Sequence, residues 1–579
     1  MAVENLITEH IDIWTSAIKT KSTSGRGSSK KLELYGVKKL RELILELAVR
    51  GKLVPQDPND EPASVLLERI AAEKAELVKE KIIRKSKSLP VVSKKEQPFV
   101  LPKGWVWERL GNIGIGATGK TPSTKQSIFF EGSIPFIGPG QINQNGEILV
   151  PEKFLSCEGL LNSTEAIEGD ILMVCIGGSI GKAAIARQTV GFNQQINAIR
   201  ALQMPSAYLY TSLSTDSFLQ ELLKKATGSA TPIINRRKWE ELLVPIAPLE
   251  EQYRIVAKVN ELMALCDQLE QQTEASIEAH QVLVTTLLDT LTDSADADEL
   301  MQNWARISEH FDTLFTTEES IDQLKQTILQ LAVMGKLVPQ DLNDEPASEL
   351  LKRIAEEKAQ LIKEKKIKKQ KALPPISEDE KPFKLPSGWE WCRLPDLGEL
   401  ARGKSKHRPR NDPKLYENGN IPLVQTGDVA RANGTILTYT AKYNEFGLAQ
   451  SQLWPKGTLC ITIAANIADT ATLGFDACFP DSVVGYTPYD KEIPTVYFDY
   501  FIKTAKENLE RFAPSTAQKN INLEILSNVL VPCPPMQQFP RIVEKVNLLL
   551  GICDELKERL KESQMSQLQL TDAIVEQAV

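Results

Sequence analysis

The chain has 579 residues, with 68 Lys and Arg against 76 Asp and Glu, which gives a formal net charge of −8 at pH 7. This length predicts several domains, each able to bury a core of its own. The eight cysteines stand without a CxxC pair and the four histidines lie far apart, which argues against a disulfide framework and a zinc site. No apolar run approaches membrane-spanning length and the N-terminus is polar, so we expect a cytoplasmic protein.

The negative charge is unevenly distributed. Acidic residues dominate from Asp289 to Asp322, where Arg306 is the only Lys or Arg, while two more variable parts of the chain, described below as inserts, carry nearly balanced charge. A partner that carries phosphates is therefore not excluded, because local basic patches can form outside the acidic stretch.

The chain contains an internal duplication. Gly51 to Ser64 (GKLVPQDPNDEPAS) and Gly335 to Ser348 (GKLVPQDLNDEPAS) are identical at thirteen of fourteen positions. The likeness continues through a Lys/Glu-rich stretch to LPKGWVW and LPSGWEW, fades, and returns as Leu243-Val244-Pro245 and Leu530-Val531-Pro532. Two similar frames thus each hold a divergent insert.

The frames are predicted to be helical. A short apolar helix is expected from Leu40 to Val49, ended by Gly51, and a second helix is expected to start at Pro62. Its basic tail, Lys79 to Lys87, is interpreted as a solvated helix end, with phosphate contact as the alternative. The additional stretch Lys21 to Lys31 of the first copy has the Ser/Gly/Lys composition of a solvated loop.

The inserts are predicted to be compact α/β domains. In the first insert, short β-like runs at Ile134 to Ile137, Ile171 to Ile176, Ala183 to Ile185 and Ala198 to Leu202 alternate with Gly, Pro and Asn turns.

A long helix with a coiled-coil seam is expected after each insert. The seam positions are Ile255, Val259, Leu262, Cys266, Leu269, Leu283 and Leu287 in the first copy, and Ile542, Val546, Leu549, Cys553, Leu556, Leu570 and Ile574 in the second. Thr273 and His280 interrupt the first seam, where we interpret them as setting register.

Two segments satisfy the phosphate-loop pattern GxxxxGK[ST], namely Gly114 to Thr121 and Gly398 to Ser405. Neither lies between a buried strand and an apolar helix, which a phosphate loop requires. We interpret them as glycine turns between the first strands of the inserts, with a nucleotide-binding NTPase as the alternative. A third possibility is that Lys120 and Lys404 contact a DNA phosphate.

The inserts carry polar, amide-rich loops. Asn and Gln can pair with adenine and Arg or Lys with guanine, so such loops are suited to reading DNA, although Asn and Gln also fill turns. The candidate DNA contacts in the first insert are Lys120, Thr121, Ser123, Lys125, Gln141, Asn143, Ser179, Asn193, Gln194, Asn197, Asn235 and Arg236. Those in the second insert are Lys404, Lys406, Arg408, Arg410, Gln425, Thr426, Asn466, Gln518, Lys519 and Asn520. The loop Lys404 to Arg410 carries four of these cations and no acid before Asp412.

The sequence carries neither of the catalytic motifs HExxH and Asn/Asp-Pro-Pro-aromatic. The duplicated order of helix pair, LPxGWxW, variable insert opening in a Gly-Lys-Thr-Pro-Ser loop, Val-Pro exit and long helix resembles the specificity subunit of type I restriction-modification systems. The sequence GKLVPQD ahead of the first insert resembles the type IB branch most.

The resemblance implies an α+β protein with two target-recognition domains separated by long antiparallel coiled-coil helices in pseudo-twofold symmetry. The implied divisions are a helical region at 1–100, target-recognition domains at 101–250 and 384–536, long helices at 251–292 and 537–579, and an acidic linker with the second helical region at 293–383.

The resemblance also implies a non-catalytic DNA-binding subunit that reads a bipartite asymmetric site. Its partners would be double-stranded DNA, two methyltransferase subunits and, through their complex, restriction subunits. S-adenosylmethionine, ATP and magnesium would belong to those partners, with no cofactor on this chain. The remaining alternative is an adaptor built on coiled coils that does not bind DNA.

Overall fold

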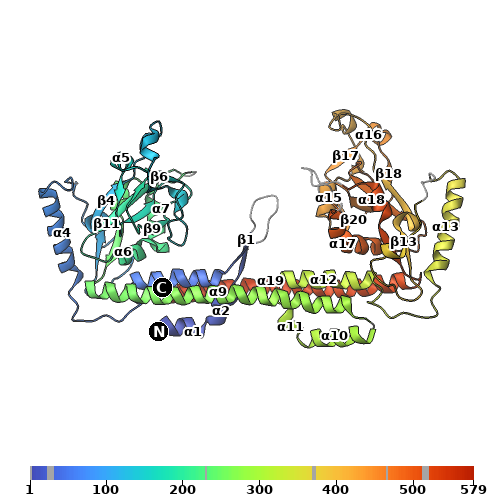
Figure 1. Cartoon of the computed structure of the whole chain (residues 1–579), viewed down its shortest axis with the longest axis horizontal. Coiled ribbons are helices and arrows are strands. Elements are labelled where there is room, and N and C mark those ends of the chain that lie inside the picture. Colours follow the sequence, from blue (N-terminus) through green and yellow to red (C-terminus); the bar gives the residue numbers. More distant parts are fainter. Residues whose placement is uncertain are drawn as a thin grey trace. The chain divides into compact units, whose positions relative to one another are not determined.

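The computed structural model describes residues 3–21, 31–85, 87–228, 231–295, 297–367, 373–464, 467–511 and 521–579. The chain forms two compact units, Met1–Ser276 with Ser563–Val579, and Ile277–Glu562. Both boundaries fall inside long helices, α9 (Leu249–Asp293) and α19 (Gln538–Ala578), so each long helix contributes to both units (Figure 1). The predicted mixture of helices and sheets in a duplicated chain is confirmed.

The frame of unit 1 is helical. The helix predicted at Leu40 to Val49 is α3 (Tyr35–Val49), which begins five residues earlier, and the helix predicted from Pro62 is α4 (Ala63–Lys79). Gly51 ends the first of these because its φ of +64° favours glycine. The frame also holds α1 (Val3–Glu9), α2 (Ile11–Ser16) and a hairpin of β1 (Lys19–Lys21) and β2 (Lys31–Glu33).

The frame of unit 2 repeats the same two helices as α12 (Glu318–Val333) and α13 (Ala347–Lys363). The acidic stretch ahead of them forms α10 (Ala297–Glu309) and α11 (Phe311–Leu314).

The first insert folds around two four-stranded sheets. One has the order β4-β11-β8-β9 and the other the order β6-β5-β10-β7, while β3 and β12 pair where the chain enters and leaves. The strands are β3 (Val106–Arg109), β4 (Gly114–Thr118), β5 (Ile134–Ile137), β6 (Lys153–Leu155), β7 (Glu165–Ala166), β8 (Ile171–Val174), β9 (Ala183–Ile185), β10 (Val190–Phe192), β11 (Ile196–Ala201) and β12 (Leu243–Ile246). The helices are α5 (Cys157–Leu161), α6 (Ser206–Leu213), α7 (Asp216–Lys225) and α8 (Arg236–Glu240).

The alternation of β8 divides the core of this domain in two. Leu172 and Val174 face the cluster shared with the second sheet, while Ile171 and Met173 face a cluster containing the helices and Trp239. Successive side chains of a strand point to opposite faces, so a fully apolar β8 is required to serve both clusters.

The second insert repeats this topology with one additional edge strand, β16, although its sequence diverges. Its sheets have the orders β14-β22-β19-β20-β16 and β17-β15-β21-β18, with β13 and β23 paired at the entry and exit. The strands are β13 (Glu390–Arg393), β14 (Gly398–Arg402), β15 (Ile421–Leu423), β16 (Thr435–Ile436), β17 (Ala441–Tyr443), β18 (Leu453–Trp454), β19 (Leu459–Thr462), β20 (Thr470–Leu473), β21 (Ala477–Cys478), β22 (Val483–Pro488) and β23 (Leu530–Cys533). The helices are α14 (Leu394–Leu397), α15 (Thr426–Arg431), α16 (Glu445–Ala449), α17 (Thr495–Arg511) and α18 (Leu523–Asn528).

The first part of each predicted seam is confirmed, because Ile255 and Ile542 are both fully buried. In the later part, the predicted Ile574 is buried, but the predictions of Leu283 and Leu570 are wrong by one residue. Leu283 and Leu570 are 49% and 48% exposed, and the neighbouring Val284 and Thr571 are buried instead. Steps of four and three from Leu269 through Thr273, Ser276 and His280 lead to Leu283, so the buried stripe departs from the regular heptad step by one residue after His280.

Polar contacts within each frame repeat the duplication. In unit 1, Trp105 Nε1 donates to Glu251 Oε2 at 2.9 Å, and in unit 2 Trp389 Nε1 donates to Gln538 Oε1 at 3.1 Å. The ion pair of Arg254 with Asp60 at 2.5 Å recurs as Arg541 with Asp344 at 2.9 Å. The two frames therefore join an insert domain to a long helix in the same way.

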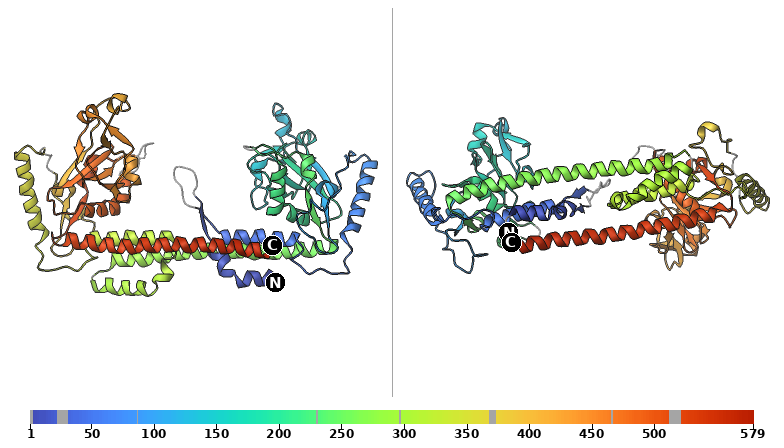
Figure 2. Two further views of the ribbon diagram at one scale, coloured as in Figure 1. Left: turned by 180° about the vertical axis from the view of Figure 1, so that it is seen from behind. Right: turned by 90° about the horizontal axis from the view of Figure 1, so that it is seen from below.

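The short helices bind the long ones through repeated cations. Arg41 of α3 pairs with Asp267 of α9 in unit 1, and Lys325 of α12 pairs with Asp554 of α19 in unit 2. Lys52 Nζ donates to the Val579 carbonyl at the end of α19 at 2.8 Å. That end of α19 is marked C in Figure 2. In unit 2, Lys336 Nζ donates to the carbonyls of Thr292 and Ser294 at the end of α9, at 2.7 and 2.8 Å. In both units a lysine thus lies at the carbonyl end of a long helix, which favours positive charge.

Candidate nucleic-acid interface

The predicted loops of the first insert meet at one edge of the domain. The carboxyl ends of β4, β5, β8 and β10 and the amino end of β11 lie together, as the strand registers require. The loops 119–126, 138–141, 175–182 and 193–195 leave from these ends. The segment 231–235 joins them because Ile233 forms a β-bridge with Ile176.

Side chains from separate loops touch at this edge. Thr121 Oγ1 donates to Gln194 Oε1 at 2.7 Å, which joins the loop after β4 to the loop before β11. Gln141 Oε1 accepts from the Gly138 backbone at 3.0 Å, and Asn193 Oδ1 accepts from the Gln195 backbone at 3.0 Å. These four predicted side chains thus lie in one cluster of loops.

The cations of the same region are available to a ligand. Lys120 and Lys125 are exposed, and within the described part of the chain neither forms an ion pair. Ser123 is exposed and Ser179 is half-buried. Arg236 is less free, because its guanidinium pairs with Glu240 at 3.4 Å and donates to the Gly116 carbonyl at 3.3 Å.

Three of the asparagines predicted as DNA contacts form hydrogen bonds within the protein. Asn197 is only 2% exposed, and its amide accepts from Thr118 Oγ1 at 2.9 Å and donates to Cys175 Sγ. It is therefore enclosed within the domain, and we correct its placement at the surface. Asn143 closes a turn by accepting from two backbone amides, and Asn235 caps α8. The latter two remain near the surface.

The first glycines of each phosphate-loop pattern lie in strands, so the expectation of glycine turns is wrong there, while Gly119 and Gly403 lie in the connections that follow the strands. Gly114 and Gly116 lie in β4, which pairs with β11, and Gly398 lies in β14, which pairs with β22. An extended chain and irregular residues follow each strand, where a nucleotide-binding loop would open a helix. The nucleotide-binding alternative is not supported.

The basic loop of the second insert is anchored by an acid from a distant part of the chain. Arg410 binds both oxygens of Asp481, at 2.6 and 2.7 Å, and Arg408 lies 4.0 Å from the same carboxylate. The absence of a nearby acid in the sequence therefore did not mean that the loop is unopposed. The missed residue, Asp481, gives no local signal because it lies 71 positions from its partner.

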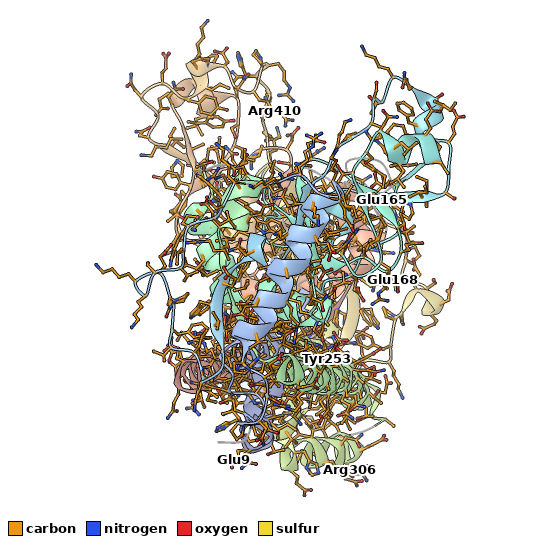
Figure 3. The ribbon with its side chains drawn as sticks, turned by 90° about the vertical axis from the view of Figure 1, so that its left-hand side faces the viewer. Glu9, Glu165, Glu168, Tyr253, Arg306 and Arg410 are labelled. Atoms are coloured by element: carbon orange, nitrogen blue, oxygen red, sulfur yellow. The ribbon has the colours of Figure 1, made fainter. Side chains whose placement is uncertain are left out.

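Two lysines of this loop remain free of carboxylates in the described part of the chain. Lys406 is exposed without an ion pair, and Lys404 Nζ donates to the neutral amide of Gln452. Arg410 lies at the end of unit 2 opposite to Arg306 of α10 (Figure 3). The loop is thus presented away from the helical frame of its own unit.

The other predicted residues of the second insert divide into two groups. Gln425 and Thr426 lie where α15 begins, and the Gln425 backbone donates to the buried carboxylate of Asp428 at 2.9 Å. Asn466, Gln518, Lys519 and Asn520 lie outside the described residues.

Among the described residues, no cluster of three or more His, Cys, Asp or Glu side chains is arranged to hold a metal ion. Within the same residues, no helix is both long enough and apolar enough to cross a membrane.

Comparison with known proteins identifies the family. A family model described as "Type I restriction modification DNA specificity domain" matches the chain twice, over residues 102–279 and 386–563. The chain belongs to the type I restriction-modification DNA specificity family. Both matches begin at the LPxGWxW segment and run into a long helix, so the repeated unit of this family is the insert domain with its helix.

Full-length relatives agree with this assignment. The chain is 43% identical to the type I restriction enzyme EcoAI specificity subunit and 41% identical to the EcoEI specificity subunit, both of Escherichia coli, with all of each chain covered. A solved structure titled for assembly and conformational transition of the type I restriction-modification system has 18% identity and a TM-score of 0.51. It covers 83% of this chain and 99% of its own, which supports the fold of this DNA specificity protein.

Proposed function

We propose that this specificity subunit reads a bipartite, asymmetric DNA site, with one half read by each insert domain. The observation that supports the proposal is the shared topology of two domains whose edge loops differ. Lys120, Thr121 and Gln194 stand at the edge of the first, whereas Lys404, Lys406 and Arg410 stand at the corresponding edge of the second. Different side chains on one scaffold are expected to select different bases.

We further propose that the frames, and not the inserts, hold the catalytic partners. The contacts of Trp105 and Trp389 with the starts of the long helices are equivalent, so the two frames offer similar surfaces to two copies of one partner. Two methyltransferase subunits are the expected partner, with restriction subunits recruited through that complex. This subunit would then be non-catalytic, and S-adenosylmethionine, ATP and magnesium would be bound by the partners.

The proposal is tested by expressing the chain with its cognate methyltransferase in a host that lacks DNA methylation. Sequencing of the methylated sites should reveal two short, different half-sites separated by unspecified bases. A single continuous site, or a palindrome, would contradict the assignment of one half-site to each domain. Methylation that does not require this chain would contradict its role in recognition.

A further inference from the structure

A basic segment outside the insert domains has no role in the fold or in the proposed reading loops. It follows α4 and comprises Lys79, Lys81, Arg84, Lys85 and Lys87, with Glu80 as its only acid. We call residues 79–87 the basic tip. All five cations are exposed, and in the described part of the chain none of them forms an ion pair.

The basic tip is held in place at both ends. On one side, Lys74 of α4 donates to the carbonyls of Gly111 and Gly114, the latter at 2.7 Å, which fixes the helix against the insert domain. On the other side, the buried Arg109 donates to the Pro90 carbonyl at 2.6 Å. The tip is therefore a short anchored projection, and α4 directs it away from the long helix α9 of the same unit (Figure 1).

The second copy repeats this construction. Lys358 of α13 donates to the Pro395 carbonyl at 2.6 Å, and the buried Arg393 donates to the Pro374 carbonyl. Lys81 and Lys365 end the two helices with φ values of +61° and +59°. The anchoring contacts and the helix ends that flank the loop are thus built twice.

The basic tip and the corresponding segment of the second copy carry positive charge at the same positions, even where the residue type differs. The segment KEKIIRKSK at 79–87 aligns with KEKKIKKQK at 363–371. Each of the five cations of the first copy therefore corresponds to a Lys in the second copy. Arg84 corresponds to Lys368, and Ser86 to Gln370. Residues 368–372 lie outside the described residues, so this comparison rests on sequence. An exposed position without an intramolecular partner has no reason in the fold to keep its charge.

We propose that the basic tip binds DNA backbone phosphates that the insert loops do not contact, and thereby adds affinity without sequence preference. This inference rests on the proposed DNA-reading function and extends it to the frame. A phosphate backbone is the expected partner because five unpaired cations in nine residues match a regular polyanion, and because a lysine presents a point charge with little geometric selectivity.

The test compares two triple variants of the full-length protein that remove equal charge. One is Arg84→Gln, Lys85→Gln, Lys87→Gln in the tip. The matched control is Lys94→Gln, Lys95→Gln, Lys103→Gln, which alters exposed lysines on the segment returning to β3, none of which is ion-paired among the described residues. Binding to a target duplex and to an unrelated duplex is measured by fluorescence anisotropy over a series of salt concentrations.

The tip variant should lower the slope of log affinity against log salt by about 2.7, from about 0.9 per phosphate contact, on both duplexes. Affinity should fall by about 10- to 100-fold near physiological salt on both, from the same release of counterions. The control should leave the slope close to that of the unmodified protein, and the methylated sequence should not change in either variant.

Equal slopes for the tip variant and the unmodified protein would overturn the inference, as would equal losses in the tip and control variants. A loss confined to the target duplex would overturn it too, since it would indicate base reading. Failure of the proposed function is recognised separately, because the unmodified protein would then not prefer its target duplex over the unrelated one. A thermal unfolding curve identical to that of the unmodified protein excludes misfolding as the cause of a loss.

Discussion

The basic loop of the second insert gives a prediction in which the structure changes the expected magnitudes. Four cations lie between positions 404 and 410, but only some of them carry charge that is free to neutralise phosphate. Arg410 is bound by both oxygens of Asp481, whereas Lys406 is exposed and free of carboxylates in the described structure. Lys406→Ala should therefore remove about one full phosphate contact and lower the salt slope by about 0.9.

Arg410→Ala should act differently from Lys406→Ala. Removing Arg410 leaves Asp481 without its bidentate partner, so the loop loses an anchor and gains an unpaired negative charge. Asp481→Asn should have the opposite electrostatic effect, because it releases Arg410 to solvent. We expect the affinity for unrelated DNA to be highest for Asp481→Asn, lower for the unmodified protein and lowest for Lys406→Ala. The loss of one phosphate contact should lower the affinity by about 3- to 10-fold.

The assay is a salt series on target and unrelated duplexes, followed by sequencing of methylated sites. Lys406→Ala should weaken binding to both duplexes equally and leave the half-sites unchanged. If its effect were confined to the target duplex, the loop would read bases and the electrostatic reasoning would be refuted. An unchanged slope with Lys406→Ala would show that the loop does not meet DNA.

Three further predictions concern the inserts, the long helices and the frame. Replacing residues 111–242 by the corresponding insert of a relative should change one half of the methylated sequence and leave the other half intact; a change in both halves would show that the domains do not read independently. Seven residues inserted after Gln272 and after Arg559 preserve each seam and lengthen each helix by about 10 Å, so the spacer between half-sites should change or methylation should cease with the complex still assembled, whereas methylation with an unchanged spacer would show that these helices do not set it. Burial raises the pKa of Glu251, so the stability that this group contributes is fully present at low pH and is lost as pH rises through the folded pKa. Glu251→Gln, which copies Gln538, should therefore raise the free energy of local opening by a few tenths to about 1 kcal/mol at pH 7 and by less near pH 4.5. Hydrogen exchange of residues 51–62 measures this effect, and an equal effect at both pH values would contradict burial as the cause.

The sequence alone was sufficient for the features that depend on local order. The repetition of GKLVPQD and LPxGWxW predicted two frames around two inserts, and apolar spacing predicted α3, α4 and the long helices close to their observed bounds. The runs at Ile134 to Ile137 and Ala183 to Ile185 are β5 and β9 with the same bounds. Such features can be predicted from the sequence because periodicity and repetition are properties of the order of residues along the chain.

Only the tertiary structure decided which polar residues face outward and which are already paired. Asn197 looked like a DNA contact among its polar neighbours, yet strand β11 turns it into the domain, where Thr118 and Cys175 hold its amide. Arg410 looked unopposed, yet Asp481 reaches it from another loop. The sequence cannot supply these pairings because they depend on which remote segments the sheets bring together, and a shift of one residue in a strand or seam moves a side chain to the other face.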